Sequence, residues 1–420
     1  MDEQKKVVIY HPFGNANTRA AVDGLYKQGI LESFHTCIAC FQGSWLYKLA
    51  SFSPLKEFRR REFSLFLKKQ TVTHPFRELG RHLTTKLKLH RLVTHEKGVF
   101  CVDYVCHDLD KKVATYIFKN KGNIGGIYAY EDLALQTFTV AKKNEIPCIY
   151  DLPIGYWRAM RSLLEEEKEK NLEWAMTLGG FNDSEKKLQR KDEELRLADR
   201  IYVASTFTKK TLEMYPGTLA SIEVIPYGFP PVNKERTYES YSNRKIRILY
   251  VGGLSQRKGI SYFFEALEGL EDKVEVTVVG RGAIEECAAL KRALAQVRYI
   301  PSLPHEEVLR LMATQDVLIF PSLFEGFGLV ITEAMSQGTP VITTNRTCGP
   351  DVITHGIDGW IVEAGTAASI KELVNKLVLN PKLLQEAGKQ ALITASKRPW
   401  EVYESELANS VNKFLNDKLS

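Results

Sequence analysis

The chain has 420 residues, of which 44% are hydrophobic and 26% charged, and it carries a net charge of +6. A chain of this length exceeds what one hydrophobic core usually supports, so two domains are expected. No uninterrupted apolar run approaches the roughly 20 residues of a membrane-spanning helix, no leader sequence is recognisable, and the seven scattered cysteines form no disulfide framework, so a cytoplasmic protein is expected.

The N-terminal half alternates expected strands with expected helices. Val7–Tyr10 is followed by a loop and by a helix over Arg19–Gln28. Gly14 in that loop gives the backbone the freedom to approach a ligand closely. The other strands that we expect are Phe34–Phe41, Gly126–Tyr130, Pro147–Tyr150 and Arg200–Ala204. Alternating strands and helices indicate an α/β domain, which we place at residues 1–230.

A basic segment, Lys56–Lys97, interrupts this pattern. It contains 12 Lys and Arg residues against 4 Asp and Glu residues, a local charge of +8, so the rest of the chain carries −2. Apolar side chains interleave with the charges, which is typical of helices that lie on an anionic membrane surface. A solvated helical face over the core explains the pattern equally simply. Nucleic acid is not expected as a partner, because no nucleic-acid-binding fold accompanies the segment.

A change of composition marks the middle of the chain. Ser162–Arg196 is long, charged and expected to be largely helical, and a further helix is expected over Thr206–Tyr215. The stretch that follows is rich in Pro, Gly and polar residues, which indicates a linker at residues 231–243. A second domain is expected at 244–395, and a terminal helix at 396–420.

The C-terminal half contains a second series of expected parallel strands. They are Ile246–Tyr250, Val274–Val279, Val317–Phe320 and Val341–Thr343. Parallel sheets built from strand–helix–strand units bind ligands at the carboxyl ends of their strands. We therefore expect two Rossmann-like domains that face each other across a cleft.

The most informative segment is the strand–helix–strand unit over Ile319–Ile342. A turn with Gly326, Phe327, Gly328, Leu329 and Val330 places free backbone N–H groups at the start of a helix, where phosphate binds well.

Two carboxylates, Glu325 and Glu333, bracket this turn. Because like charges repel, these groups do not favour phosphate, but they accept hydrogen bonds from the hydroxyl groups of a ribose or a sugar. The unit therefore predicts a ligand with both phosphate and hydroxyl groups, which describes a nucleotide sugar.

Two cations follow the first strand of this half. Arg257 and Lys258 stand between Gly253 and Gly259, where a diphosphate is expected. Gly280 belongs to a short Gly-Arg-Gly turn after the next strand and is expected to border the donor. That turn lacks the third glycine of a dinucleotide fingerprint, so no nicotinamide cofactor is expected. The histidines form no recognisable metal-binding pattern, and neither a metal nor a cofactor is expected.

These segments resemble the retaining glycosyltransferases of GT-B fold in the large family numbered four, also called the group 1 glycosyl transferases. The resemblance is carried by Tyr250–Ile260, Val278–Gly282, Ile319–Ile342, Gly349–Asp351 and Gly356–Trp360. It is much weaker in the N-terminal half. It implies a metal-independent enzyme that transfers a sugar from a nucleoside diphosphate sugar to a hydroxyl group of a glycan, a lipid-linked glycan or a small metabolite. It also implies a terminal helix that crosses back to the N-terminal domain.

The resemblance assigns roles to residues of the second domain. Glu333 is expected to hold the ribose hydroxyls, and Glu325 to lie beside the transferred sugar. Lys258 falls on the phosphate-binding lysine of the family. The arginine that is usual in the family falls on Gly253, and we expect Arg257 to replace it. The glycines Gly14, Gly253 and Gly280 and the turn residues 326–330 complete the expected donor site.

The first domain departs further from the family pattern. Tyr130 stands where many members carry a histidine, and Glu131 follows it. Glu131 and Asp132 can bind an acceptor, or they can be ordinary acids at the end of a strand. Asp151 and Arg158 follow the next strand and are further acceptor-side candidates, together with Tyr156.

Two other functions remain open at this stage. A sugar-nucleotide epimerase would use Glu131 and Asp132 as acid and base, whereas a phosphorylase would need a pyridoxal phosphate lysine motif that we do not find. A non-catalytic nucleotide-sugar-binding partner subunit would explain the departures at Gly253 and Tyr130. If the basic segment contacts lipid, the protein is expected to be peripheral at the inner membrane face.

Overall fold

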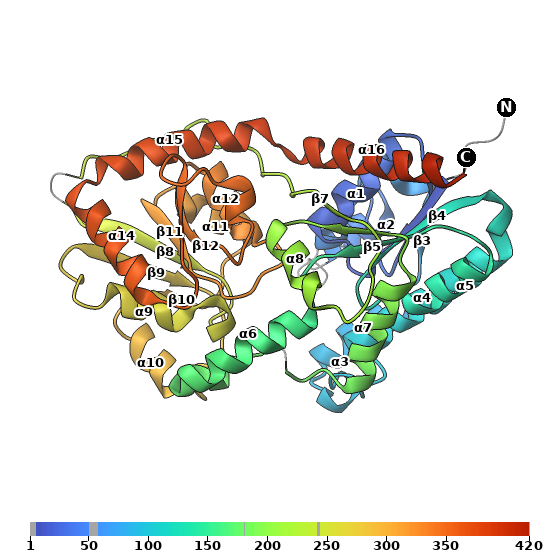
Figure 1. Cartoon of the computed structure of the whole chain (residues 1–420), viewed down its shortest axis with the longest axis horizontal. Helices are drawn as coiled ribbons and strands as arrows, with labels where there is room; N and C mark the ends of the chain where they lie inside the picture. Colours follow the sequence, from blue (N-terminus) through green and yellow to red (C-terminus); the bar gives the residue numbers. More distant parts are fainter. Residues whose placement is uncertain (1–5, 50–57, 180, 242–243, 420) are drawn as a thin grey trace.

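The computed structural model describes residues 6–49, 58–179, 181–241 and 244–419. The chain forms two lobes, each built on a parallel sheet covered by helices (Figure 1). The expected α/β architecture of two Rossmann-like domains is confirmed. Lys56 and Glu57 of the basic segment, and residues 242–243 of the expected linker, lie outside the described residues.

The N-terminal lobe contains a seven-stranded sheet in the order β3-β2-β1-β4-β5-β6-β7, with every neighbouring pair parallel. Its central strands β1, β4 and β5 are almost completely buried, as in sheets covered by helices on both faces. The strands are β1 Lys6–Tyr10, β2 Leu31–Thr36, β3 Thr71–Thr73, β4 Ile124–Tyr130, β5 Cys148–Leu152, β6 Arg200–Val203 and β7 Ile222–Val224.

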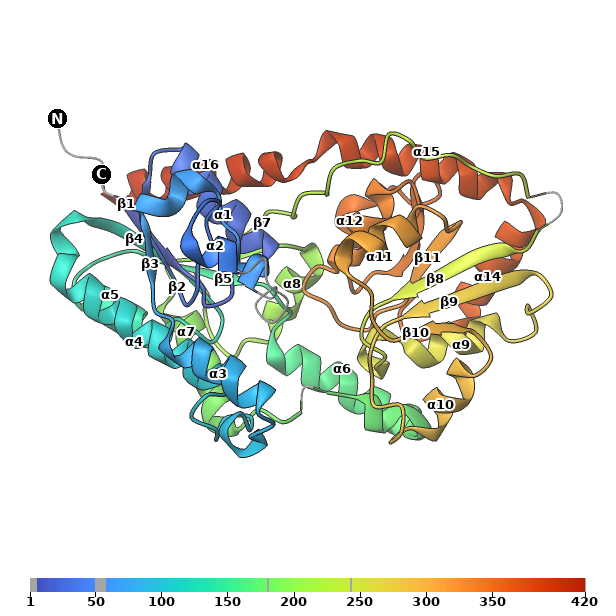
Figure 2. The ribbon, with the colours of Figure 1, turned by 180° about the vertical axis from the view of Figure 1, so that it is seen from behind.

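Helices cover both faces of this sheet. Helix α1 lies with the terminal helix α16 (Trp400–Leu419) on one face, while α4, α5 and α7 pack against one another on the other face (Figures 1 and 2). The helices of this lobe are α1 Ala16–Lys27, α2 Trp45–Leu49, α3 Phe76–Lys86, α4 Val102–Asn120, α5 Leu135–Lys143, α6 Trp157–Lys170, α7 Glu185–Leu197 and α8 Thr206–Thr211.

The C-terminal lobe contains a six-stranded parallel sheet in the order β10-β9-β8-β11-β12-β13. Its strands are β8 Ile246–Val251, β9 Val274–Val279, β10 Arg298–Ile300, β11 Val317–Phe320, β12 Val341–Thr344 and β13 Gly359–Val362. Its helices are α9 Ile260–Leu267, α10 Ala288–Leu294, α11 His305–Met312, α12 Leu329–Ser336, α13 Gly349–Val352, α14 Ala367–Leu379 and α15 Lys382–Lys397.

The chain crosses between the lobes in both directions. Helix α15 packs on α12 of the C-terminal lobe, and α16 (Trp400–Leu419) then runs along the N-terminal lobe and packs on α1 (Figure 2). In the other direction, Leu164 of α6 joins the core of the C-terminal lobe, and Asn171 donates a hydrogen bond of 2.9 Å to the Tyr262 hydroxyl. Residues 157–178 therefore belong to both lobes, which the sequence did not indicate.

Two expected elements differ from those observed. The second strand ends at Thr36 rather than Phe41, because the chain turns there and Cys40 pairs instead with Glu62. The stretch Ser162–Arg196 is not one long helix. Helix α6 ends at Lys170, a 3₁₀ helix covers Leu172–Thr177, and α7 begins only after Ser184, whose side chain caps the first turn by accepting from the Lys187 amide.

No helix among the described residues is long and apolar enough to cross a membrane, in agreement with the hydropathy of the sequence.

Candidate functional site

A cavity of about 1080 Å³ lies between the lobes, where the carboxyl ends of β1, β8 and β11 face each other. This is where open parallel sheets bind their ligands. Among the residues predicted from the sequence, those that line it are Gly14, Gly253, Arg257, Lys258, Glu325, Gly326, Phe327, Gly328, Leu329, Val330 and Glu333.

The loop after β11 supplies the floor of the cavity. Gly328 has a φ of +93° and precedes the first residue of α12, a backbone conformation that side chains other than glycine rarely adopt. Gly328 has no side chain that could cap the N-terminus of α12. Gly328, Leu329 and Val330, which begin this helix, all line the cavity, and the first amide groups of a helix have no partner within the helix.

Glu325 connects this loop to the two cations. This residue is 7% exposed, and its Oε1 accepts a hydrogen bond of 2.8 Å from Ser322 Oγ. The same oxygen forms an ion pair with Lys258 Nζ and lies 3.4 Å from Arg257 Nη1. Arg257 Nη1 also donates to the Phe324 carbonyl at 2.7 Å. One carboxylate thus fixes both cations at the carboxyl end of β8.

Lys258 lies in a weakly solvated position. Burial lowers the pKa of its ammonium group, and the Glu325 carboxylate opposes that shift. The ammonium also lies 5.1 Å from the centroid of the Phe320 ring, which lines the same cavity. A cation with so little solvent around it interacts strongly with an incoming anion.

Glu333 lies on α12 at the edge of the cavity. Its Oε1 is 3.0 Å from Nε2 of His305, at the start of α11, and this contact raises the pKa of His305. The His305 side chain is exposed, whereas Glu333 is partly buried. The imidazole holds the carboxylate in one orientation and leaves its other oxygen for a ligand.

The loop after β1 forms the opposite wall. Nδ1 of His11 accepts hydrogen bonds from the Phe13 and Gly14 amides at 3.1 and 3.0 Å. Burial and the nearby Arg61 lower the pKa of His11 to about 3, so the ring stays neutral and can accept these bonds. Gly14 has a φ of +60°, and a Cβ there would lie 2.3 Å from the Phe63 ring.

The two walls touch at Gly326. A Cβ on this residue would lie 1.8 Å from the Pro153 carbonyl oxygen, so only glycine allows this approach. The Gly326 carbonyl accepts hydrogen bonds from Ser205 Oγ at 2.6 Å and from Thr208 Oγ1 at 2.9 Å. The loop that carries Glu325 is therefore bonded directly to the N-terminal lobe.

Gly280, predicted to border the donor, does not line the cavity. It has a φ of +157°, and a Cβ there would lie 1.8 Å from the Gly252 carbonyl oxygen. Its carbonyl accepts a hydrogen bond of 3.1 Å from Tyr299. This glycine allows the loops after β8 and β9 to pack closely, and the loop after β8 in turn supplies Gly253 to the cavity.

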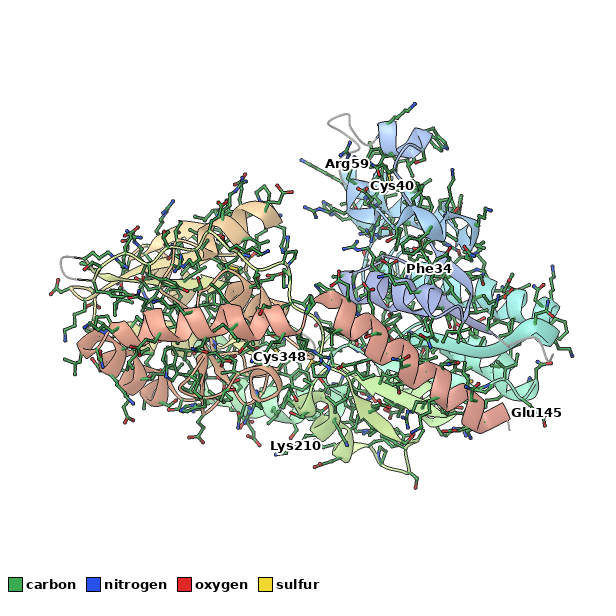
Figure 3. All side chains as sticks on the ribbon, turned by 90° about the horizontal axis from the view of Figure 1, so that it is seen from above. Phe34, Cys40, Arg59, Glu145, Lys210 and Cys348 are labelled. Atoms are coloured by element: carbon green, nitrogen blue, oxygen red, sulfur yellow. The ribbon has the colours of Figure 1, made fainter. Side chains whose placement is uncertain are left out.

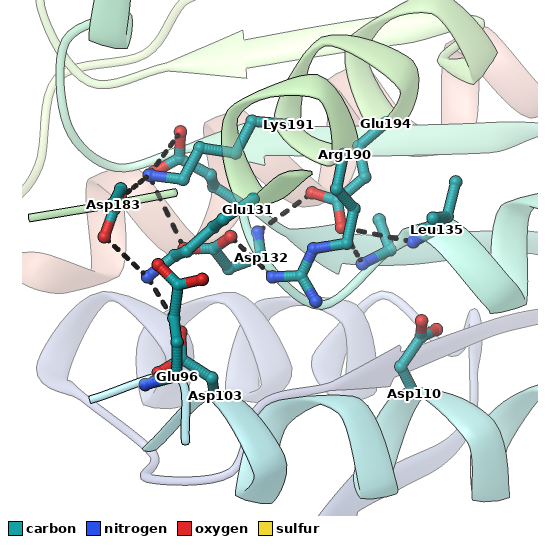
Figure 4. A network of polar contacts seen from close by, with 12 residues as sticks. Glu96, Asp103, Asp110, Glu131, Asp132, Leu135, Asp183, Arg190, Lys191 and Glu194 are labelled. Atoms are coloured by element: carbon teal, nitrogen blue, oxygen red, sulfur yellow. Dashed lines mark hydrogen bonds and ion pairs between the residues drawn. The ribbon is translucent and has the colours of Figure 1, made fainter. Parts of the chain in front are cut away.

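Glu131 and Asp132, predicted on the acceptor side, do not line the cavity either. They point toward α7, where Asp132 binds Arg190 at 2.6 Å and Glu131 lies 3.7 Å from Lys191 (Figure 4). Burial raises the pKa of Glu131 to about 7, against the effect of Lys191. Asp132 has a φ of +68°, so the chain turns away from the cleft immediately after β4.

The other acceptor-side candidates are also outside the cavity. Tyr130 is buried, with its ring at 5.0 Å from that of His11 in an edge-to-face contact. Asp151 is buried beneath it and accepts a hydrogen bond of 2.7 Å from the Tyr128 hydroxyl. Arg158 binds Asp192 of α7 at 2.7 Å, and the Tyr156 hydroxyl donates to the same carboxylate group.

The N-terminal wall instead contains cations that the sequence did not assign to the site. The basic segment was recognised, but nothing in a linear charge pattern shows that one of its faces lines the cleft. The residues are Arg19, Arg60, Arg61, Arg81, His82 and Lys86, and they are joined by Asn15, Asn17 and Tyr227.

Comparison with known proteins finds a family match in the C-terminal half of the chain. Residues 233–393 match the family model described as "Glycosyl transferases group 1". The amylovoran biosynthesis glycosyltransferase AmsK of Erwinia amylovora is 29% identical over 171 residues, which cover 37% of this chain and 42% of AmsK. The chain spans about half the length or less of the curated relatives first matched.

Solved structures match over the whole chain. Sucrose-phosphate synthase from Thermosynechococcus elongatus covers 99% of this chain and 100% of its own, with a TM-score of 0.66 and 16% identity. HepE of Anabaena, solved in complex with UDP-glucose, covers 98% of this chain and 100% of its own, with a TM-score of 0.60 and 16% identity. At these identities the likeness concerns the fold, which is GT-B.

Proposed function

We propose that the protein is a glycosyltransferase that uses a nucleoside diphosphate sugar, because residues 233–393 match the family model of the group 1 glycosyl transferases. The observation that supports this best is the arrangement around Glu325. Two cations, the free amides of α12 and a second carboxylate, Glu333, line one cavity between the lobes. That set matches a ligand with a diphosphate at one end and hydroxyl groups at the other.

The charges at the cavity floor suit a diphosphate. Lys258 and Arg257 carry +2, and Glu325 leaves a net +1 that is supplemented by the positive end of α12. A diphosphate competes with Glu325 for both cations, and Arg257 can bind two of its oxygens at once. In this proposal Glu333 accepts hydrogen bonds from the ribose hydroxyls, while His305 keeps the carboxylate oriented.

The proposed reaction retains the anomeric configuration and needs no metal. As the bond between the anomeric carbon and the phosphate breaks, Lys258, Arg257 and the α12 amides stabilise the charge that develops on the leaving diphosphate. The acceptor hydroxyl attacks on the face that the diphosphate leaves, and its proton passes to the leaving phosphate oxygen. Glu325 lies where positive charge develops on the sugar.

An epimerase receives no support from the same geometry. It requires acid and base groups beside the sugar, and the carboxylates considered for that role, Glu131 and Asp132, are bound by lysine and arginine side chains of α7 (Figure 4).

Release of nucleotide tests this proposal. UDP-, GDP- and ADP-sugars are incubated with the protein, and free nucleotide is measured, since a transferase also releases it slowly by hydrolysis. Lys258→Ala should lower the rate by about 100-fold or more, the usual loss when one group that stabilises developing charge is removed. Lys210→Ala, an exposed lysine outside the cavity, is the control. Equal rates for Lys258→Ala and wild type would reject the assignment.

We further propose that the enzyme binds membrane surfaces through α3. The outward face of this helix is apolar: Phe76 is 70% exposed, and Leu79 and Leu83 are 46% and 59% exposed. Its inward face is polar and carries the buried Glu78. Exposed basic residues, including Lys68, Lys69 and Lys88, lie in the same segment. An apolar stripe flanked by cations matches an anionic lipid surface.

Vesicle flotation tests the membrane contact. Vesicles with 30–40% of an anionic phospholipid (roughly that of a strongly anionic leaflet) should carry the wild-type protein upward, and Leu83→Asp should reduce the bound fraction severalfold. Leu379→Asp on α14, where the wild-type leucine is 85% exposed, is the matched control and should float as wild type does. Equal flotation of the two variants would show that α3 is not the membrane contact.

A further inference from the structure

Helix α6 contacts both of the loops that carry the charged residues of the proposed donor site. It crosses between the lobes on the side opposite α15 and α16, which lie at the top of Figure 1 and face the viewer in Figure 3. At the start of α6, Ala159 packs with Phe207 and Phe324, and Phe324 directly precedes Glu325. Toward its end, α6 bonds to the 3₁₀ turn Gln256–Lys258 after β8. One helix of the N-terminal half therefore contacts both loops that meet at Glu325.

The contact with the 3₁₀ turn is made by Glu167 of α6. This residue is 7% exposed, and its Oε1 accepts a hydrogen bond of 2.7 Å from Gln256 Nε2. The Tyr262 hydroxyl donates to both carboxylate oxygens at 3.0 and 2.9 Å, and the Asn171 side chain also donates to Oε1. Because hydrogen bonds to a carboxylate are stronger than those between neutral groups, Glu167 holds the Gln256 side chain firmly.

Gln256 is fixed through its backbone as well as its side chain. The residue is completely buried, and its amide donates a hydrogen bond of 2.8 Å to Thr177 Oγ1 at the end of the 3₁₀ helix that follows α6. Its Nε2 also donates to Ser261 Oγ at 2.6 Å, and its Oε1 accepts from the Ser261 amide at 3.2 Å. Two residues of the N-terminal half thus hold this one residue of the turn.

Arg257 and Lys258 directly follow Gln256 in the same turn. Both cations line the cavity, whereas Glu167 and Gln256 do not. On the other side of the turn, the Arg257 carbonyl accepts a hydrogen bond of 2.9 Å from the Leu323 amide. The turn is therefore held between α6 and the loop after β11, and the positions of the two cations depend on both contacts.

We propose that Glu167 is a positioning residue of the donor site, which acts through Gln256 on the two cations that bind the diphosphate. The proposal rests on the proposed function. Charge on a leaving diphosphate is stabilised well only by groups that are already in place, so a turn released from α6 loses rate although both cations are still present. Part of the support for the donor site then comes from outside residues 233–393, the part that matches the family model.

The rate of nucleotide release at saturating donor tests this role, with whichever of UDP-, GDP- and ADP-glucose the wild-type protein hydrolyses fastest. Glu167→Ala and Gln256→Met should each lower kcat about tenfold or more, because Arg257 and Lys258 are displaced. Glu167→Gln keeps an oxygen that accepts from Gln256, and its kcat should stay within about threefold of wild type.

Tyr262→Phe is the matched control. It removes a hydrogen bond from the same carboxylate and so weakens the docking of α6, but it leaves the bond between Glu167 and Gln256 intact. Its melting temperature should fall, while its kcat should stay within about twofold of wild type, because only stability is affected. A Tyr262→Phe protein as slow as Glu167→Ala would show that Glu167 only anchors α6, which would overturn the proposal.

The double variant Glu167→Ala/Gln256→Met tests whether the two residues act through one contact. Effects of residues in direct contact are not additive, so the double variant should be about as slow as the slower single variant. Two losses that multiply would overturn the proposal. If Glu167→Ala does not fold, Gln256→Met, which keeps a side chain of similar length, is compared with Tyr262→Phe, and a Gln256→Met protein as fast as that control would overturn it.

Failure of the proposed function gives a different result. No release by the wild-type protein, or equal release by Lys258→Ala, overturns the donor site and the role of Glu167 with it. Release that depends on Lys258 but not on Glu167 or Gln256 overturns the positioning role alone.

Discussion

Arg257 and Lys258 follow each other in the chain and share a single carboxylate oxygen of Glu325. Gly253 stands where the resemblance to the glycosyltransferase family leads us to expect an arginine, and we propose that Arg257 takes its place. Gly253 lines the cavity, and among the described residues a Cβ built on it meets no atom within 4 Å, so a side chain can start there without a clash. Arg257 lies in the turn that follows and lines the same cavity as Gly253.

We predict that an arginine introduced at position 253 compensates for the loss of Arg257. Arg257→Ala should reduce nucleotide release by about 100-fold, because one of two diphosphate-binding cations is lost. Adding Gly253→Arg in the same chain should restore at least a tenth of the wild-type rate, since the open space at position 253 admits the side chain. A double variant as slow as Arg257→Ala would show that Arg257 does not replace the missing arginine.

Asp151 provides a pH-dependent prediction. Burial raises the pKa of this carboxyl to about 7, whereas an unfolded chain ionises it near pH 4. Between these values the native state holds a proton that the unfolded state has lost, so the stability of the wild-type protein falls as pH rises from 4 to 7.

Asp151→Asn removes this dependence and keeps an acceptor for the Tyr128 hydroxyl. The free energy of unfolding of Asp151→Asn minus that of the wild-type protein should increase by up to about 1.4 kcal/mol per pH unit between pH 4 and 7. Above pH 7 this difference should stay constant. Urea denaturation of both proteins at several pH values measures this difference. A difference that does not change with pH would show that Asp151 is ionised in the native state.

At the scale of elements, the junction of α1 and α16 depends on Gly24. A Cβ on this residue would lie 2.3 Å from the Glu404 carbonyl oxygen, and Lys27 and Glu404 form an ion pair beside it. Tyr403, Leu407 and Val411 are buried in the same contact region. The missing side chain lets the two helix backbones approach each other.

Gly24→Ala should therefore act against the usual helix preference. Alanine normally stabilises a helix by up to about 1 kcal/mol over glycine, but here we expect destabilisation of about 1–3 kcal/mol from the forced contact. Thermal unfolding measures the change. Gly122→Ala, where a Cβ meets nothing within 4 Å, is the control and should be neutral or slightly stabilising. A Gly24→Ala protein at least as stable as wild type would disprove the close contact.

The elements also show what sequence patterns can predict. The strands β1, β8, β9, β11 and β12 are short buried apolar runs, and their positions were predicted to within one residue. The unit over Ile319–Ile342 was predicted because its glycines and carboxylates stand at fixed offsets within one supersecondary unit. The end of β2 and the break after Lys170 were missed, because both are decided by contacts with distant residues such as Glu62 and Tyr262.

The residues predicted on the acceptor side show more clearly what the sequence alone could not predict. Glu131 and Asp132 have the residue types of a substrate-binding pair, yet α7 supplies the cations that turn them away from the cleft. Arg19, Arg60 and Arg81 come from three separate stretches of chain and meet only in the folded protein. Because these residues are far apart in the sequence, no characteristic spacing between them indicates that they lie in one site.

At the scale of the whole molecule, each half of the chain reaches into the other lobe. The α6 segment packs on the C-terminal lobe, α16 packs on the N-terminal lobe, and the Gly326 carbonyl bonds to Ser205 and Thr208. These contacts hold the two walls of the cavity at a fixed separation.

The structure of a complex with a nucleotide would show most directly whether the donor site lies at Lys258, Arg257 and Glu333. The nucleotide among UDP, GDP and ADP that raises the melting temperature most would be used to form it, since ligands stabilise the state they bind. We predict that the diphosphate lies against Lys258, Arg257 and the amides of residues 328–330, with the ribose hydroxyls on Glu333. A nucleotide bound elsewhere, or a diphosphate bound only by the arginines of the N-terminal wall, would contradict it.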